Sequence, residues 1–161
     1  MLRVQQLMSH HVHVCRPDDS LETASRMMWE QDIGVVAVVD GNRRAIAMLT
    51  DRDACMAALF TGRALSQIPV SKAMSKGLYS VRRDQPIDAA ELVMRQHQVR
   101  RIPVVDDDGR IVGLLSQNDL VNEAARERET RRKELSAVAV TATLADIGRS
   151  RVGSLAPAIA V

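Results

Sequence analysis

Apolar residues recur along the chain in two kinds of pattern. Short apolar runs are typical of buried strands, and they lie within residues 34–40, 45–49, 101–106 and 111–115. Other apolar residues recur at the spacing of a helix with one buried face, and these are Leu21, Ala24, Met27 and Met28, then Ile87, Ala90, Val93 and Met94. Two further runs, at 12–15 and 78–81, are expected to be strands. Each half of the chain is therefore predicted to form a strand, a helix, two strands and a second helix.

Residues that favour helix starts precede each predicted helix. Ser20 can cap the first helix by accepting a hydrogen bond from a backbone N–H, and Asp84 with Pro86 can begin its counterpart. The second helix of each half is predicted to begin at a hydroxyl residue, Thr50 or Ser116, directly after the last strand. Polar stretches with glycine between the two central strands are predicted turns.

The two halves are copies of one another. When residues 4–57 are placed over residues 70–123 without a gap, identical residues meet at Val4, Met8, Ser9, Arg16, Asp18, Ala24, Met28, Val38, Val39, Asp40, Arg44, Leu49 and Asp53. A match of this length indicates an internal duplication. One copy of about fifty residues could not cover its own sheet well, so the copies are expected to pack face to face as a pseudo-symmetric pair.

The duplication predicts a division of the chain into three parts. Residues 1–66 form the first repeat, residues 67–125 the second, and residues 126–161 a C-terminal extension. Within 123–135 the last helix is expected to continue with a solvated face of mixed charge. From Ser136 onward the Ala-, Val- and Thr-rich sequence leaves three alternatives open: a short strand, a docked helix or a loose tail.

Composition narrows the classes of function. Of 161 residues, 46% are hydrophobic but only 2% are aromatic, so the core must be built from aliphatic residues, methionine and alanine. The net charge of +2, without a basic run or aromatic stacking residues, argues against a nucleic-acid partner. The sequence has no apolar run long enough for a membrane span and no signal-like N-terminus, so a cytoplasmic protein is expected.

The remaining chemistry-bearing residues favour structural roles. His11, His13 and Cys15 alternate along one predicted strand, but ligands spread over about 13 Å are too far apart for one ion, so no metal site is expected. Cys55 is interpreted as a small apolar filler, with redox sensing as the alternative. His97 lies on an apolar helix stripe and is interpreted as a core or boundary residue. No nucleophile elbow, P-loop or dinucleotide fingerprint is present, so the chain is expected not to be an enzyme.

Each predicted second helix begins with a hydroxyl residue followed three positions later by an acid, as Thr50 and Asp53 or as Ser116 and Asp119. The plain interpretation is a capping box, which starts the helix. The same helix start also offers unpaired N–H groups and partial positive charge to an anion. The hydroxyl could then donate to a phosphate oxygen, the acid could accept from two ribose hydroxyls, and Arg52 could add positive charge. The two interpretations are compatible, because one helix start can serve both.

The duplication, with the stretches TDRD (50–53) and RIPVVDDDGRIVGLLSQNDL (101–120), resembles a tandem pair of CBS domains, the cystathionine-β-synthase-type regulatory unit or Bateman module. The resemblance implies an α+β fold of two β-α-β-β-α repeats packed with pseudo-twofold symmetry. It implies clefts that bind an adenosine-containing ligand (AMP, ADP, ATP or S-adenosylmethionine), with no obligatory cofactor. A homodimer and an effector protein regulated by the ligand are further family expectations.

The resemblance also carries ligand-binding residues over by position. In one cleft Asp119 would hold the ribose, Ser116 the phosphate, and Arg100 and Arg101 would flank that phosphate. The opposite wall of this cleft would comprise His11, His13, Ile33, Gly34 and Val35. The other cleft would use Thr50, Arg52 and Asp53 against Gly77, Tyr79, Val99 and Arg100.

The leading hypothesis is a non-catalytic, stand-alone regulatory module that binds an adenosine nucleotide and signals to a partner. Repeat 1 departs from the family pattern at Ala47, where repeat 2 has the family's Gly113. The alternative is therefore a structural or protein-interaction module whose clefts are degenerate and empty. A third hypothesis is nucleic-acid binding through the Arg-rich segment 126–133, which predicts affinity that falls steeply with salt.

Overall fold

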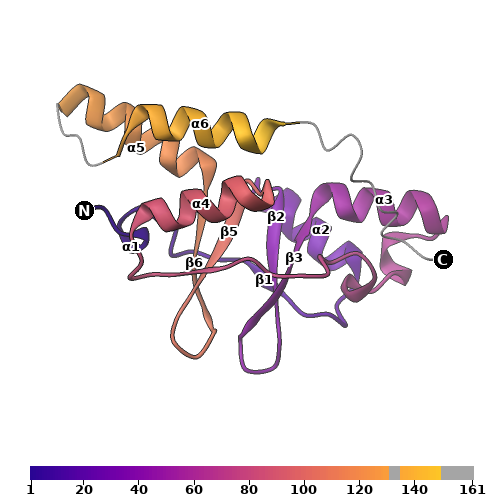
Figure 1. Ribbon diagram of the computed structural model, residues 1–161. Coiled ribbons are helices and arrows are strands. Elements are labelled where there is room, and N and C mark those ends of the chain that lie inside the picture. The colour runs from indigo at the N-terminus through magenta and orange to yellow at the C-terminus, as the bar shows by residue number, and fades with distance from the viewer. Residues whose placement is uncertain (131–134, 150–161) are drawn as a thin grey trace. The chain divides into compact units, whose positions relative to one another are not determined.

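The structure, a computed structural model, describes residues 1–130 and 135–149 (Figure 1). These residues form two compact units. The repeat-1 unit consists of residues 12–78, and the repeat-2 unit combines residues 1–11 with residues 79–149. The two units therefore divide the chain differently from the sequence repeats, since the first eleven residues pack with the second repeat.

The repeat-1 unit contains a three-stranded sheet with the order β1-β2-β3. Its elements are β1 (Val14–Cys15), α2 (Leu21–Glu30), β2 (Val35–Val39), β3 (Ala45–Thr50), α3 (Asp51–Thr61) and the short 3-10 helices η1 (Leu65–Gln67) and η2 (Val70–Lys72). β1 runs parallel to β2, and β3 runs antiparallel to it, with Val35 opposite Thr50.

The repeat-2 unit contains a sheet of the same design, with the order β4-β5-β6. Its elements are α1 (Val4–Leu7), β4 (Val81–Arg82), α4 (Ile87–His97), β5 (Arg101–Val105), β6 (Ile111–Ser116), α5 (Gln117–Thr130) and α6 (Ala137–Gly148). β4 runs parallel to β5, and β6 runs antiparallel to it, with Arg101 opposite Ser116. The predicted element order and the α+β fold with two β-α-β-β-α repeats are confirmed.

The first strand of each repeat is shorter than predicted. The runs at 12–15 and 78–81 were expected to be strands, but only Val14–Cys15 and Val81–Arg82 are, and β4 extends one residue past its run. Both are edge strands that pair with the central strand at two positions. A strand prediction from apolar residues alone overestimates such edges, because their length depends on how far the neighbouring strand runs alongside.

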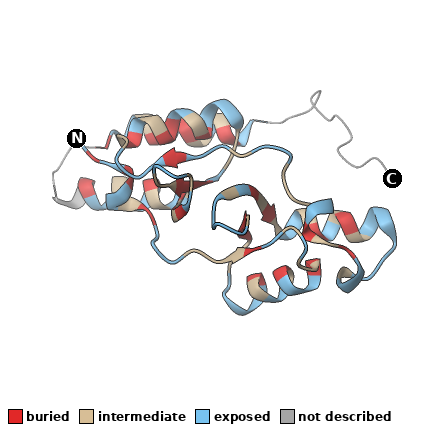
Figure 2. Ribbon diagram, turned by 90° about the horizontal axis from the view of Figure 1, so that it is seen from below, coloured by how far each residue is buried: buried red, intermediate tan, exposed pale blue. Residues whose placement is uncertain are grey.

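Helix starts follow the sequence signals closely. The Ser20 hydroxyl accepts a hydrogen bond from the Thr23 N–H at 3.1 Å, as expected of the cap of α2. Pro86 occupies the position before Ile87, the first residue of α4. Each helix then buries its apolar stripe in an aliphatic core, which Figure 2 shows as red inward faces.

The first residues of each sequence repeat belong to the unit formed by the other repeat: residues 1–11 to the repeat-2 unit, and residues 67–78 to the repeat-1 unit. In the repeat-2 unit, Ser9 and Leu114 exchange two backbone hydrogen bonds of 2.9 Å. In the repeat-1 unit, the Ser75 N–H donates to the Met48 carbonyl at 2.8 Å, and the Met48 N–H donates to the Ser75 hydroxyl at 3.0 Å. Ser9 and Ser75 occupy matching positions of the duplication, and so do Leu114 and Met48. The two crossovers therefore join matching positions, but the second bond ends on a backbone carbonyl in one and on a serine hydroxyl in the other.

The C-terminal extension contains a docked helix, which decides among the three alternatives for the residues after Ser136. The Ser136 hydroxyl accepts from the Ala139 N–H and caps α6, which packs on α4 and α5 (Figure 1). Val140, Thr143 and Ile147 are its buried residues. The rest of the extension, 131–134 and 150–161, lies outside the described residues. No described helix is long and apolar enough to cross a membrane.

Candidate functional site

The start of α3 is closed by a reciprocal pair of side chains. The Thr50 hydroxyl accepts from the Asp53 N–H at 3.1 Å, and Asp53 Oδ2 accepts from the Thr50 N–H at 3.0 Å. The Thr50 hydroxyl also donates to Asp53 Oδ2 at 2.7 Å. The capping box predicted from the sequence is therefore present.

The start of α5 repeats this arrangement. Asp119 Oδ2 accepts from both the N–H and the hydroxyl of Ser116, each at 2.7 Å, and the Ser116 hydroxyl accepts from the Asp119 N–H at 3.3 Å. In both repeats the acid is half-buried, and among the described residues its other oxygen, Oδ1, takes part in no hydrogen bond.

One detail of the sequence interpretation is corrected. The hydroxyl of Thr50 or Ser116 was expected to be free to donate to a phosphate oxygen, but it donates to the neighbouring aspartate. A phosphate at either helix start would first meet the backbone N–H groups of that start. The hydroxyl could turn to the anion only by giving up its bond to Asp53 or Asp119.

Several of the predicted site residues of repeat 1 lie beside the Thr50–Asp53 pair. Val35 is opposite Thr50 in the sheet, and the Gly34 carbonyl accepts from the Asp51 N–H at 3.3 Å. A Cβ atom on Gly34 would lie 3.2 Å from Asp51 Oδ2, so glycine allows the close approach of this loop to the helix start. Ile33 precedes this loop, and the Arg52 side chain is exposed on the first turn of α3.

The equivalent residues of repeat 2 lie beside the Ser116–Asp119 pair. Arg101 is opposite Ser116 in the sheet, and the Arg100 carbonyl accepts from the Gln117 N–H at 2.9 Å. Both arginines are exposed. The backbones of these two arginines thus lie next to the start of α5, and their predicted contact with a phosphate stays a prediction.

The other predicted residues are placed separately. His11 is exposed in the repeat-2 unit, whereas His13 and Gly77 belong to the repeat-1 unit, where the Gly77 carbonyl accepts from the Ser75 hydroxyl at 2.8 Å. Tyr79 lies in the repeat-2 unit and stacks on His97, with the ring centroids 3.6 Å apart. His97 is exposed, so its interpretation as a core or boundary residue was wrong. Its position at the C-terminal end of α4, where the apolar stripe ends, would have been the signal.

Comparison with known proteins decides the family. The family description "CBS domain" matches residues 4–59 and again residues 67–126. The chain belongs to the CBS domain family. A Bacillus subtilis relative, "CBS domain-containing protein YhcV", is 34% identical over 128 residues, which make up 79% of this chain and 89% of the relative.

Solved structures of CBS domain pairs share the fold. The pair of protein MJ0100, in complex with 5-methylthioadenosine and S-adenosyl-L-methionine, aligns with a TM-score of 0.70 and 20% identity over 79% of this chain and 98% of its own. CBSX2 in complex with AMP aligns with a TM-score of 0.68 and 23% identity over 80% of this chain and 99% of its own.

Residues 1–11 and 67–78, the two crossover segments, form hydrogen bonds with β6 and β3, the strands that lead into the CBS helix starts. In repeat 2, a Cβ atom on Gly113 would lie 2.5 Å from Met8 Sδ and 3.1 Å from the Ser9 carbonyl oxygen, so glycine allows Met8 and Ser9 to cross close to this strand of the CBS repeat. Repeat 1 has a buried Ala47 at the matching position. The pairing of Met8–Ser9 with β6 was not predicted, although both residues recur in the duplication.

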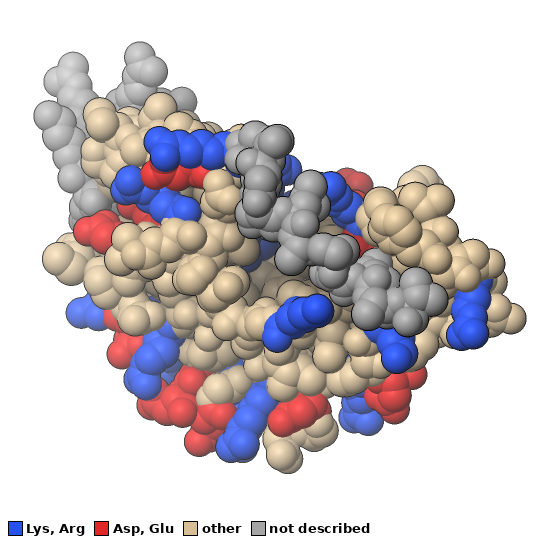
Figure 3. Space-filling view, turned by 45° about the vertical axis from the view of Figure 1, so that its right-hand side comes forward, with Lys and Arg blue, Asp and Glu red and all other residues tan. Residues whose placement is uncertain are grey.

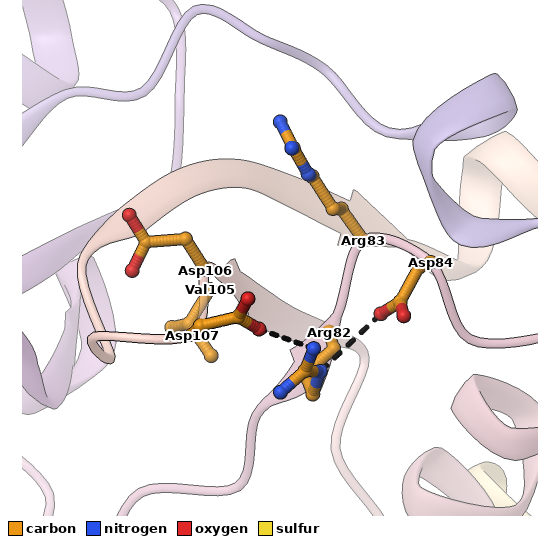
Figure 4. Close-up of a pocket in the computed structure, with 6 residues that line it drawn as sticks. All are labelled: Arg82, Arg83, Asp84, Val105, Asp106 and Asp107. Carbon is orange, nitrogen blue, oxygen red and sulfur yellow. Dashed lines mark hydrogen bonds and ion pairs between the residues drawn. The ribbon is translucent and has the colours of Figure 1, made fainter.

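A cavity at the far end of the second CBS sheet does not suit a nucleoside. Figure 4 shows Arg82 lying between Asp84 and Asp107, with which it forms ion pairs, while Arg83 points away from them. The cavity has a volume of ≈ 130 Å³, below the several hundred Å³ typical of ligand pockets. Its charged groups hold the turns at the ends of β4 and β5.

The cysteines of the CBS pair differ in environment. Cys15 is buried in β1, and its burial, with a smaller contribution from Asp19, raises the pKa of its thiol to about 12. This environment favours a structural filler, because the reactive form of a cysteine is the thiolate. Cys55 is exposed on α3. Among residues 1–130 and 135–149, no three His, Cys, Asp or Glu side chains are grouped to hold a metal ion.

Charges on the described surface are mixed. On the face that Figure 3 shows, Lys and Arg side chains alternate with Asp and Glu side chains. Part of the Arg-rich segment 126–133, on which the nucleic-acid hypothesis rests, lies outside the described residues. The expected lack of a nucleic-acid partner stays a prediction.

Proposed function

We propose that this CBS pair is a non-catalytic regulatory module that binds an adenosine-containing ligand and passes the signal to an effector protein. The observation that carries the proposal is the hydroxyl–aspartate pair that occurs at both helix starts. In each pair Oδ2 of the aspartate closes the helix, and no described residue bonds to Oδ1.

The chemistry of these helix starts fits a nucleotide. A carboxylate oxygen can accept from the two vicinal hydroxyls of a ribose, and a helix N-terminus favours an anion such as phosphate. We assign the ribose to Asp119 and, in the other repeat, to Asp53. Arg100 and Arg101 at one start, and Arg52 at the other, would supply positive charge for the phosphate. Structures with this fold hold AMP in CBSX2 and S-adenosyl-L-methionine in MJ0100, which supports AMP, ADP, ATP or S-adenosylmethionine as the ligand class.

The remaining predicted residues would complete the two ligand sites. We assign His11, His13, Ile33, Gly34 and Val35 to the ligand of Asp119, and Gly77, Tyr79, Val99 and Arg100 to the ligand of Asp53. A ligand that binds two conformations of the pair with different affinity would shift their populations, and the effector would respond to that shift.

Ligand-induced stabilisation tests the proposal against the alternative of an interaction module with empty clefts. We expect AMP or S-adenosylmethionine at a hundred times its Kd to stabilise the wild type by about 2.7 kcal/mol per site, which raises the Tm by several degrees. Asp119→Ala or Asp53→Ala should weaken binding about tenfold or more, because hydrogen bonds to a charged acceptor are lost.

A control separates loss of ligand binding from loss of a helix cap. Ser20→Ala removes the cap of α2 at a cost of about 1 kcal/mol, a cost similar to that expected of either aspartate variant, without touching a proposed ligand contact. The ligand-induced Tm shift should persist in this variant. A wild type with no shift at millimolar ligand would favour the empty-cleft alternative.

Self-association is the second part of the proposal. Three large apolar side chains of α2 and α3 in repeat 1 are exposed, with Trp29 at 87%, Leu59 at 68% and Phe60 at 58%. Exposed apolar groups on neighbouring helices suit a protein interface. Glu22 and Arg26 of α2 carry opposite charges on the same exposed helix, which suits a second copy related by a twofold axis.

Sedimentation of the purified chain tests this surface. The wild type should be a homodimer, and Phe60→Glu should shift it toward the monomer. Val138→Glu is the matched control, because Val138 is 79% exposed but lies on α6. A monomeric wild type, or equal effects of the two substitutions, would contradict the assignment.

A further inference from the structure

A glutamine in the left-handed conformation ends α4 in the repeat-2 unit. Gln98 has a φ of 52°, in the region that favours glycine at the end of a helix. The Val99 N–H donates to the Met94 carbonyl at 3.1 Å and completes the turn that closes this helix end. Glycine would form the same turn without steric strain, so the turn alone does not explain a glutamine at this position.

The Gln98 side chain reaches the end of a second helix. Its amide Nε2 donates to the Asp146 carbonyl at 3.2 Å and to the Arg149 carbonyl at 3.3 Å, both at the C-terminal end of α6. The last carbonyls of an α-helix lack regular partners within it, so these two bonds help to close the end of α6. Arg95 of α4 also pairs with the Asp146 carboxylate at 2.7 Å. The last turn of α6 is therefore attached to the last turn of α4.

The backbone after Gln98 leads directly to the start of α5. Two residues further on, the Arg100 carbonyl accepts from the Gln117 N–H at 2.9 Å. Gln117 is the first residue of α5, and the Ser116–Asp119 pair closes that helix start. The position of the Arg100 backbone beside this helix start therefore depends on the turn at Gln98.

Repeat 1 has the same turn without the same attachment. Asp32, which matches Gln98 in the duplication, also has a φ of 52°, and the Ile33 N–H donates to the Met28 carbonyl at 2.9 Å. Among the described residues, no helix packs on α2 and α3 as α6 packs on α4 and α5. The turn thus belongs to both repeats, whereas its bonds to a docked helix are described in repeat 2 alone.

We propose that α6 is the element that responds to the ligand of Asp119, and that Gln98 is the positioning residue that links the two. This inference rests on the proposed function and deepens it, because it states how one ligand site is regulated. When α6 is docked, the Gln98 amide fixes the turn and so holds Arg100 beside the start of α5. When α6 is released, the turn loses this anchor, and ordering it again costs affinity. The ligand therefore binds the docked form more tightly, and by linkage it strengthens the docking of α6 by the same factor.

Binding measurements on turn variants test one direction of this coupling. Isothermal titration with AMP and S-adenosylmethionine is carried out on the full-length wild type and on Asp53→Ala, which leaves Asp119 as the proposed ribose ligand. Two further substitutions are then added to Asp53→Ala. Gln98→Gly keeps the left-handed turn without the amide, and Gln98→Met keeps the side-chain length without a donor. We expect each of them to weaken binding about fivefold, within the usual range of coupling between sites.

The matched control is Arg43→Gly in the same background. Arg43 is an exposed residue with a φ of 61° in the turn between β2 and β3, and it belongs to the repeat-1 unit. Its replacement removes the strain of a left-handed residue without changing a bond to α6. Binding in this control should equal that of Asp53→Ala.

Hydrogen exchange tests the reverse direction. Amides of α6 should exchange about fivefold more slowly when AMP or S-adenosylmethionine saturates Asp53→Ala, because the ligand favours the docked form. This ligand effect should disappear when Gln98→Gly is added. A residue that merely stabilised the turn would change stability without making exchange in α6 depend on the ligand.

The possible failures can be told apart. The inference is overturned if Gln98→Gly binds the ligand as Arg43→Gly does, if the ligand leaves exchange in α6 unchanged, or if Asp53→Ala alone abolishes binding. A wild type that binds neither AMP nor S-adenosylmethionine overturns the proposed function as well.

Discussion

In the repeat-2 unit, the outer sides of α4 and α5 pack against α6, whereas the structure describes no such helix on α2 and α3 of repeat 1. The residues at matching positions differ accordingly. Glu91 is buried, within 3.5 Å of the Thr143 hydroxyl of α6, and Arg95 pairs with Asp146 of α6 at 2.7 Å. Repeat 1 has Ser25 and Trp29 at these positions.

The two copies share the helix start but differ on the outer surface of their helices. Both copies keep the hydroxyl–aspartate pair, the sheet register and the crossover segment, which together build a helix start. The outer helix surface is free to diverge, because nothing in the helix start depends on it. One copy packs against a docked helix and the other has exposed apolar residues, so the two copies have chemically distinct helical faces.

A charge placed under α6 should have the largest effect on stability and should affect the repeat-2 unit selectively. Val140→Asp buries an unpaired carboxylate between α6 and its neighbours, and we expect it to lower the free energy of unfolding by about 3 kcal/mol. Val138→Asp, on the exposed side of the same helix, should change it by less than about 0.5 kcal/mol. Urea unfolding measures both effects.

Hydrogen exchange then locates the effect of Val140→Asp. Amides of β5 should lose protection while those of β2 keep it, since α4 and α5, the helices that α6 packs against, belong to the repeat-2 unit. Equal loss in both strands would mean that the two units unfold together.

The crossover position should give an effect of intermediate size. Gly113→Ala copies the residue of repeat 1 into repeat 2, where the new Cβ meets Met8 Sδ and the Ser9 carbonyl oxygen. We expect a loss of about 1–2 kcal/mol, measured by urea unfolding. Adding Met8→Ala should recover part of it, because the two sites are coupled. Full additivity of the two substitutions would contradict the predicted contact.

The pH dependence of stability should show the smallest effect. Burial raises the pKa of the Glu91 carboxyl above its ordinary value, with nearby Asp88 adding to the rise, while the Thr143 hydroxyl and Arg95 oppose it. A carboxyl with a raised pKa in the folded state contributes stability that is fully present below its unfolded pKa and lost as pH rises through the folded pKa. Glu91→Gln should therefore stabilise the protein at neutral pH relative to the wild type. The gap should close as pH falls below the ordinary Glu range; a pH-independent gap in urea unfolding would contradict this.

Local chemistry was predictable from the sequence. Ser20 caps α2, Thr50 and Ser116 begin their helices, and the apolar runs form the central strands, because each of these depends on residues within one turn or one strand. The family resemblance extended the prediction to Arg100 and Arg101 as phosphate-flanking residues. Their backbones lie beside Ser116 and Gln117, and their role stays a prediction.

Long-range packing was not predictable in the same way. The pairing of Ser9 with Leu114 spans most of the chain, and no local signal distinguishes it from a pairing within repeat 1. The docking of α6 involves Glu91, Arg95 and Asp146, and none of these residues alone indicates in the sequence that two helices pack there. The Tyr79–His97 stack likewise joins a loop to a helix end, and no local pattern pairs two residues so far apart in the sequence.

The crossover of residues 1–11 also determines the order in which this chain can fold. During synthesis, residues 12–78 can form their sheet and core before the second repeat has emerged, because the described strands and helices of that unit all lie within this range. Ser9, by contrast, must wait for Leu114, and such distant pairing slows folding. A cut at residue 66 would leave each half without a segment that it needs, whereas a fragment of residues 12–78 keeps a whole unit. The sequence repeats and the compact units thus have boundaries about eleven residues apart. The N-terminal residues 1–11 are therefore among the last parts of the chain to pack.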